Sequence, residues 1–236
     1  MRSKPVGDVQ TISPRPECQE RVRVSLNQLL LTTPGYSATR FPHGKETMTA
    51  MTRVITLAEF LKLPDTQPAS EFIDGQISQK PMPQGKHSTL QIRLADTIND
   101  VGFPQKIAYA FPELRCTFGG RSIVPDVAVF KWERIPFDAD GEVANTFELA
   151  PDWTIEILSP DQSQTRVTDN IVFCLKHQTR LGWLIDPDEK AVICFQPNQL
   201  PEVLRQPQDS LPVPDFLDLR LSVGQVFSWL KLGQRF

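Results

Sequence analysis

Hydrophobic and polar residues follow recognisable periods from about residue 56 onward. Thr56 precedes the apolar segment LAEFLKL, and Glu59 stands three residues later, which is the capping-box pattern of a short helix. Residues 71–80 alternate on both sides of Asp74-Gly75, a dipeptide that strongly indicates a tight hairpin turn. The pattern therefore predicts a short helix followed by a β-hairpin.

Longer periodic segments follow the hairpin. Residues 87–101, 163–178 and 222–231 carry apolar side chains at helical spacing, which predicts three helices. Six segments predict strands: 106–111, 113–118, 122–132, 153–158, 183–187 and 191–196. The segment 122–132 is expected to form one long strand. This order of elements predicts an α+β fold, a sheet flanked by helices.

The first 47 residues show no sustained period. They contain five prolines among scattered Ser, Thr and Arg, so residues 1–47 are expected to form a poorly ordered N-terminal tail. A folded domain is expected over residues 48–236. Met48 and Met51 stand where the patterned sequence begins. An over-extended gene start is therefore one interpretation of the tail.

Composition narrows the class of protein. Hydrophobic residues are 40% and charged residues 22% of the chain, as in globular domains. The net charge of −3 excludes a protein coated in basic charge, so any contact with nucleic acid needs a local basic patch. There is no apolar run of membrane-spanning length, no export signal and no CxxC spacing among the four cysteines. We expect a cytoplasmic protein with reduced cysteines and no membrane contact.

Two acidic residues stand inside apolar segments, where charge is costly. Asp126 lies in IVPDVAVF and Glu156 in WTIEIL. If these strands are neighbours, both carboxylates can converge at one point. Two buried like charges require a cation or a proton, and paired carboxylates with water suit Mg²⁺ or Mn²⁺. The alternative is a solvated Asp126, with Glu156 paired to Arg115 or Arg121.

Two further residues are weaker candidates. His87 opens the helix 87–101 on its apolar face, which packs on the sheet that carries the acids; a structural core histidine is the default interpretation. Glu71, ahead of the Asp74-Gly75 turn, is otherwise a solvated strand residue. The chain has no phosphate-binding loop, no serine nucleophile elbow and no zinc-ligand spacing.

Four segments in this order carry a resemblance to a known family. FIDGQISQKPMPQGKH, SIVPDVAVF, PDWTIEILSPDQS and GWLIDPDEKAVICFQP resemble the Uma family of bacterial "putative restriction endonucleases", within the PD-(D/E)xK nuclease superfamily. The resemblance covers about residues 52–236. It implies a restriction-endonuclease-like core with a mixed central β-sheet flanked by helices. It also implies hydrolysis of DNA phosphodiester bonds with Mg²⁺ or Mn²⁺ and, by analogy, a homodimer.

The resemblance also assigns residues to the site. Asp126 and Glu156 match the two metal-binding catalytic acids of the family. Glu71 matches its acid before the turn and is expected as a further metal ligand, and His87 matches a histidine at the edge of the site. The basic residues expected to contact phosphates are Lys86, Arg115, Arg121, Lys131 and Arg166.

One position departs from the family pattern. The superfamily usually places a lysine two residues after the second acid, where this chain has Leu158. The resemblance to the Uma family implies that this lysine comes instead from the predicted helix 163–178. Its position there is occupied by Asn170, which carries no charge. Arg166, one turn earlier, and Lys176 are the candidate substitutes, so Arg166 and Asn170 complete the expected catalytic set. The departure leaves open a catalytically degenerate protein that acts as a binding or regulatory module. A hydrolase of another phosphate ester is a third hypothesis.

Overall fold

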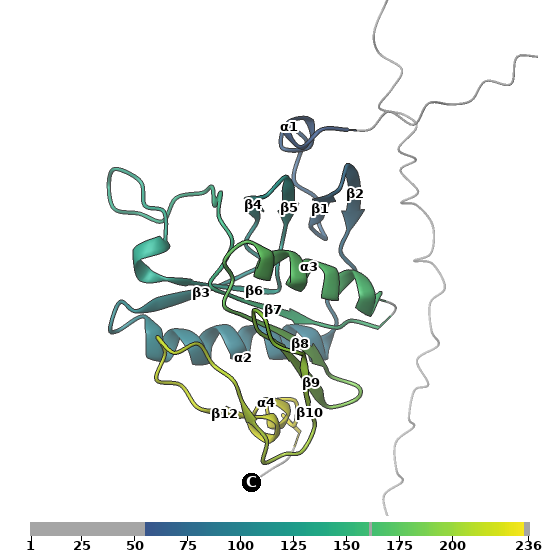
Figure 1. The fold of residues 1–236 in the computed structure, drawn as a ribbon, viewed down its shortest axis with the longest axis vertical. Coiled ribbons are helices and arrows are strands. Elements are labelled where there is room, and N and C mark those ends of the chain that lie inside the picture. The colour runs from purple at the N-terminus through teal and green to yellow at the C-terminus, as the bar shows by residue number, and fades with distance from the viewer. Residues whose placement is uncertain (1–54, 161, 234–236) are drawn as a thin grey trace, which may run out of the picture. The chain divides into compact units, whose positions relative to one another are not determined.

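The computed structural model describes residues 55–160 and 162–233. A central sheet has helices on both faces, which confirms the predicted α+β class (Figure 1). The helices are α1 (Leu57–Phe60), α2 (Gly85–Gly102), the 3-10 turn η2 (Trp132–Arg134), α3 (Gln164–Lys176) and α4 (Val223–Ser228). The predicted tail, residues 1–47, lies outside the described residues. None of the helices within them is long and apolar enough to cross a membrane.

The central sheet is mixed. Its six strands lie in the order β10-β9-β8-β7-β6-β3, and all neighbours are antiparallel except β7 and β8, which are parallel. The bounds are β3 (Ala108–Pro112), β6 (Val127–Lys131), β7 (Trp153–Ile157), β8 (Leu181–Asp186), β9 (Ala191–Phe195) and β10 (Glu202–Leu204). A parallel pair needs a crossover connection, and α3 supplies it between β7 and β8.

A smaller antiparallel sheet, with strands in the order β2-β1-β5-β4, lies on the α3 side of the central sheet (Figure 1). Its strands are β1 (Ser70–Ile73), β2 (Gln76–Gln79), β4 (Cys116–Phe118) and β5 (Arg121–Ile123). The predicted hairpin is confirmed as β1–β2, and Asp74 and Gly75 take positive φ angles of 50° and 81° in its turn. The capping box of Thr56 and Glu59 is also confirmed.

The segment 122–132 does not form the single strand that its apolar character predicted. β5 ends at Ile123 and β6 begins at Val127, because Pro125 has no N–H to donate to a ladder. At this break the chain passes from the smaller sheet into the central sheet. Asp126 therefore stands immediately before β6, at the point where the chain changes sheets.

The two faces of the central sheet pack against different layers. The face toward α2 and α4 forms an apolar core in which Trp153 and Trp183 meet edge to face with ring centroids 4.7 Å apart. The opposite face packs against α3 and the smaller sheet. The proline-rich connection after β9 contains β10 and the small pair β11 (Ser210–Leu211) and β12 (Leu221–Ser222), which the periodicity did not predict. The last helix, α4, is shorter than the predicted range.

Candidate active site

The two buried acids meet at one end of the β6–β7 pair. In this antiparallel ladder Val127 lies opposite Ile155, so the next position outward brings Asp126 opposite Glu156. Both side chains are buried, with exposures of 1% for Asp126 and 3% for Glu156. The N–H of Ile157 donates to Asp126 Oδ2 at 2.7 Å and holds the Asp126 carboxylate against β7. The structure therefore brings together the two residues that the strand pattern placed on facing positions.

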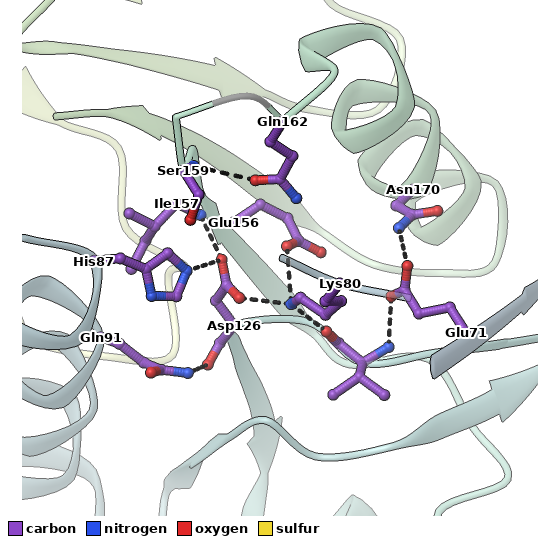
Figure 2. Close-up of polar contacts among 11 residues, drawn as sticks. Glu71, Lys80, His87, Gln91, Asp126, Glu156, Ile157, Ser159, Gln162 and Asn170 are labelled. Carbon is purple, nitrogen blue, oxygen red and sulfur yellow. Dashed lines mark hydrogen bonds and ion pairs between the residues drawn. The ribbon is translucent and has the colours of Figure 1, made fainter. Parts of the chain in front are cut away.

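A lysine that the sequence did not mark lies between these acids. Lys80 follows β2 directly, and its Nζ is 2.5 Å from Asp126 Oδ1 and 3.8 Å from Glu156 Oε2 (Figure 2). The same ammonium donates to the backbone oxygen of Val124 at 2.7 Å. Lys80 and Asp126 are 46 residues apart in the chain, and a lysine at the end of a hairpin strand normally faces solvent. Only the tertiary structure reveals its place.

Helix α2 fixes Asp126 from the other side. His87, in the first turn of α2, is buried, and its Nε2 lies 3.0 Å from Asp126 Oδ2 (Figure 2). Because Asp126 can only accept in its ionised form, Nε2 carries the hydrogen of this contact. One turn later Gln91 donates its amide to the backbone oxygen of Asp126 at 2.9 Å. His87 therefore orients one oxygen of the first acid.

Glu71 lies near the acid pair but is occupied by protein donors. Its Oε1 accepts the N–H of Val124 at 2.9 Å, and its Oε2 accepts the side-chain amide of Asn170 at 3.3 Å (Figure 2). Glu71 was expected as a metal ligand and Asn170 as a catalytic residue. In this structure the two side chains are hydrogen-bonded to each other, and Glu71 also binds the backbone of Val124, two residues before Asp126.

The remaining predicted cations lie elsewhere. Arg166 donates to Ser78 Oγ at 2.8 Å and joins α3 to β2 instead of reaching the acids. Arg121 pairs with Asp74 at 2.6 Å and with Asp169 at 2.7 Å. Arg115 donates to the backbone oxygen of Ser70 and to Ser122 Oγ. The alternative in which Arg115 or Arg121 neutralises Glu156 is therefore wrong, because Lys80 takes that place.

The charges in this cluster do not balance. Burial raises the pKa of Asp126, but the nearby Lys80 ammonium and the His87 contact outweigh it and lower that pKa to about 2. Burial also raises the pKa of Glu156 well above its usual value; Lys80 opposes this shift, whereas Asp126 and Glu71 add to it. Burial alone would lower the pKa of Lys80, yet the three carboxylates raise it overall. Asp126 and Lys80 form the ionised pair, and Glu156 is the acid left without a matching charge.

A small cavity opens onto this cluster. Its lining residues are Pro68, Ala69, Lys80, Pro81, Pro83, His87, Glu113, Asp126, Ser159 and Gln162. Its volume is about 10 Å³, which is room for about one water molecule. Across residues 55–160 and 162–233, no group of three or more His, Cys, Asp or Glu side chains is arranged to hold a metal ion. Asp126 and Glu156 are the carboxylates that could share one, with two protein oxygens.

A mixed sheet with helices on both faces and two acids that meet at the end of adjacent strands is the arrangement expected from the resemblance to restriction-endonuclease-like proteins. The family model of Uma2, described as "Putative restriction endonuclease", matches residues 57–224, and the chain belongs to this family. A crystal structure described as that of "a putative nuclease belonging to DUF820" from Anabaena variabilis ATCC 29413 is similar, with 62% sequence identity and a TM-score of 0.74. The match covers 75% of this chain and 99% of that chain. Among curated proteins, none matches the chain. The predicted family resemblance is confirmed.

Proposed function

We propose that this protein is a divalent-metal-dependent endonuclease that hydrolyses phosphodiester bonds of DNA. The observation that carries the proposal is the meeting of Asp126 and Glu156, two buried carboxylates of adjacent strands, beside a cavity that Asp126 and a buried lysine both line. The description of the matched family as a restriction endonuclease supports the substrate class. The same metal chemistry would also serve another phosphate ester, so the substrate requires its own test.

The donor set fits Mg²⁺ or Mn²⁺. These ions prefer oxygen ligands, and Mg²⁺ commonly takes one or two protein carboxylates and fills its other positions with water and substrate phosphate. The Lys80 ammonium, 2.5 Å from Asp126 and 3.8 Å from Glu156, shows that a positive charge is accommodated at this point. Three buried carboxylates, those of Glu71, Asp126 and Glu156, face that one ammonium. Burial and the two neighbouring carboxylates raise the pKa of Glu156, and a bound cation would allow that acid to ionise.

The reaction would be hydrolysis at phosphorus. Water adds to the phosphorus, the bond to one bridging ester oxygen breaks, and the departing oxygen gains a proton while the water loses one. When bound, the metal ion supplies positive charge to the phosphate under attack and activates water. Ile157 and His87 hold Oδ2 of Asp126, its Oδ1 faces the Lys80 ammonium, and Glu156 supplies the second carboxylate. The rigid strand pair keeps both oxygens in place before substrate arrives.

Contacts to the rest of the nucleic acid would come from exposed cations. Lys86, at the start of α2, and Arg166, on α3, lie on elements that flank the acid pair, and the exposed Lys86–Asp188 contact can yield to a phosphate. Arg115 and Arg121 are already engaged by protein groups. Cleavage of both strands of a duplex would use two copies of the site, as a homodimer provides.

An inert scaffold of the same fold is the second candidate function. The sequence favours this alternative at one position, because Asn170 stands where the family resemblance implies a lysine. The Lys80 ammonium beside both acids weighs against it, because the cluster has a cation from another element. An inert scaffold also has no need for a buried acid whose ionised form its surroundings disfavour, as is the case for Glu156.

The test is cleavage of supercoiled plasmid by the full chain with Mg²⁺ or Mn²⁺, with a chelator as control. We expect nicked or linear product only with metal, and a loss of about 10²-fold or more in Asp126→Asn and Glu156→Gln. RNA and single-stranded DNA in parallel define the substrate. A folded wild-type protein that cleaves none of these with either ion would contradict the proposal.

A further inference from the structure

We propose that Lys80 is the catalytic cation of this site and that Asn170 has exchanged roles with it, becoming a structural partner of Glu71. The inference rests on the proposed nuclease function and names the residue that contacts the phosphate under attack. The resemblance of the sequence to its family places a lysine at position 170, where this chain has Asn170. The structure places an ammonium at the acids from a different element.

The position of Lys80 is specific. Its side chain is only 11% exposed. Its ammonium donates to Asp126 Oδ1 and to the backbone oxygen of Val124, and it forms an ion pair with Glu156 Oε2 at 3.8 Å. Burying an ammonium is unfavourable unless it is well paired, so this arrangement is not that of an incidental surface lysine. Lys80 also lines the cavity together with Asp126 and His87.

Other cations do not compete for this role. Of the basic side chains in the described residues, Lys80 alone makes ion pairs with both Asp126 and Glu156. Arg166 is bonded to Ser78, and Lys176 is an exposed residue at the far end of α3. The candidates that the helix offered by spacing are therefore directed away from the acids.

Asn170 approaches the same cluster from the opposite side. Its amide donates to Glu71 Oε2 at 3.3 Å (Figure 2), whereas the N–H of Val124 donates to the other oxygen, Oε1. Glu71 is also close enough to Lys80 to favour its charged form. Positions 80 and 170 thus flank one group of carboxylates, and a side chain longer than asparagine at 170 would carry a charge into that group. Glu71 is thus the carboxylate that both positions approach, Asn170 through a hydrogen bond and Lys80 through its charge.

The role assigned to Lys80 is electrostatic. Its fixed positive charge stabilises the negative charge that develops on the phosphate oxygens, and its N–H groups orient the attacking water. It transfers no proton in this account. Removing one such preorganised donor from an active site typically costs about 10²–10³-fold in rate.

The experiment compares wild type with Lys80→Met, with the double variant Lys80→Met/Asn170→Lys, and with Lys176→Met as a matched lysine control. Each protein is measured for plasmid cleavage, for Mn²⁺ affinity in the absence of DNA, and for its thermal unfolding temperature. Lys80→Gln, which keeps a hydrogen-bond donor, replaces Lys80→Met if that variant does not fold.

We expect Lys80→Met to lose about 10²-fold or more in cleavage rate while it binds Mn²⁺ at least as tightly as wild type, because a competing positive charge is gone. The double variant should recover at least about tenfold of that loss, since it returns a cation to the cluster. Lys176→Met should match wild type in all three measurements.

Three outcomes would overturn the inference. One is a folded Lys80→Met protein that cleaves at the wild-type rate. A second is a parallel loss of Mn²⁺ affinity, which would make Lys80 a structural support of the acids. A third is a folded, Mn²⁺-binding double variant without recovery, which would refute the exchange with Asn170. An inactive wild type would instead refute the proposed nuclease, and the Mn²⁺ comparison would still report on Lys80.

Discussion

The two ends of strand β7 both carry a buried acid, and the two acids are neutralised to different extents. At the start of the strand Asp152, which is 2% exposed, pairs with Arg134 at 2.8 Å and accepts the N–H of Lys131 at 2.9 Å. At the other end Glu156, which is 3% exposed, has the shared ammonium of Lys80 at 3.8 Å. Burial of a carboxylate is therefore common to both ends. Incomplete neutralisation distinguishes the end at which we propose chemistry.

This difference has an energetic meaning. A buried ion pair with its hydrogen bonds satisfied holds the fold in one arrangement, and its removal from one side leaves an unpaired charge. A buried acid whose charge is only partly matched destabilises the metal-free protein. The Asp152 end should therefore support folding, whereas the Glu156 end should cost stability that a bound cation restores.

The largest expected effect is on stability at the Asp152 end. Asp152→Asn should lower the free energy of unfolding by about 3 kcal/mol, because Arg134 is left without its counter-charge. The folded fraction should keep the wild-type cleavage rate per active molecule, because Asp152 lies at the opposite end of β7 from the cavity. Urea unfolding and plasmid cleavage of the same preparation test both statements. A strong loss of specific activity would remove the distinction between the two ends.

A smaller effect is expected where Glu71 supports the functional end. Glu71→Gln should reduce cleavage by about 10–100-fold, because the segment leading into Asp126 loses a charged acceptor for the N–H of Val124. The fold should persist, since Asn170 can still bond to the new amide. Cleavage kinetics combined with Mn²⁺ affinity would show whether the loss lies in the metal site. A cleavage rate equal to wild type would show that Glu71 has no positioning role.

The third prediction concerns pH. The pKa of Glu156 is raised in the folded protein, so its protonated form contributes stability that is fully present below the unfolded pKa and is lost as pH rises through the folded value. Glu156→Gln should therefore stabilise the metal-free protein on the order of 1 kcal/mol at pH 8, or ~2–4 °C in Tm, and by less at pH 4. Asp126, with a pKa lowered to about 2, stabilises the fold above its unfolded pKa and loses that contribution as pH falls toward 2. Thermal unfolding of wild type and Glu156→Gln with a chelator present, at pH 4 and pH 8, measures this difference in Tm. An equal change in Tm at pH 4 and pH 8 would show that ionisation of Glu156 does not destabilise the folded protein.

The smallest effect is expected at the surface. Arg121 joins Asp74 in the β1–β2 turn to Asp169 on α3 and stacks on Phe173, so it ties the smaller sheet to the helix. Because both acids are exposed, Arg121→Gln should lower the free energy of unfolding by about 0.5–1 kcal/mol and leave cleavage unchanged. Chemical unfolding at low and high salt checks this, since the effect should shrink with added salt. A loss of cleavage would place Arg121 in the substrate contact.

The parts that were predictable from sequence are those with a local signal. The hairpin at Asp74-Gly75, the capping box at Thr56 and the long helix α2 follow from turn chemistry and periodicity, and the structure has all three. Asp126 and Glu156 were identifiable because charge inside an apolar segment is rare. Their meeting depends on the strand order β7-β6, which the pattern made possible and did not determine.

The rest depended on long-range packing. Lys80 lies at the end of a hairpin strand and has no local feature that separates it from a solvated lysine. The break between β5 and β6 shows the same limit, because the apolar run across Pro125 concealed a change of sheet. The sequence pattern indicated a cation on the helix that carries Arg166, whereas the structure has it on Lys80, directly after the β1–β2 hairpin.

We propose that the Glu156 end of β7 holds a divalent cation. Titration of the full chain with Mn²⁺, followed by calorimetry or electron paramagnetic resonance, tests it without assuming a substrate. We predict one site in wild type and in Asp152→Asn, with affinity reduced by about tenfold or more in Asp126→Asn and Glu156→Gln. No binding by the wild type, or equal affinity in all four folded proteins, would contradict the account.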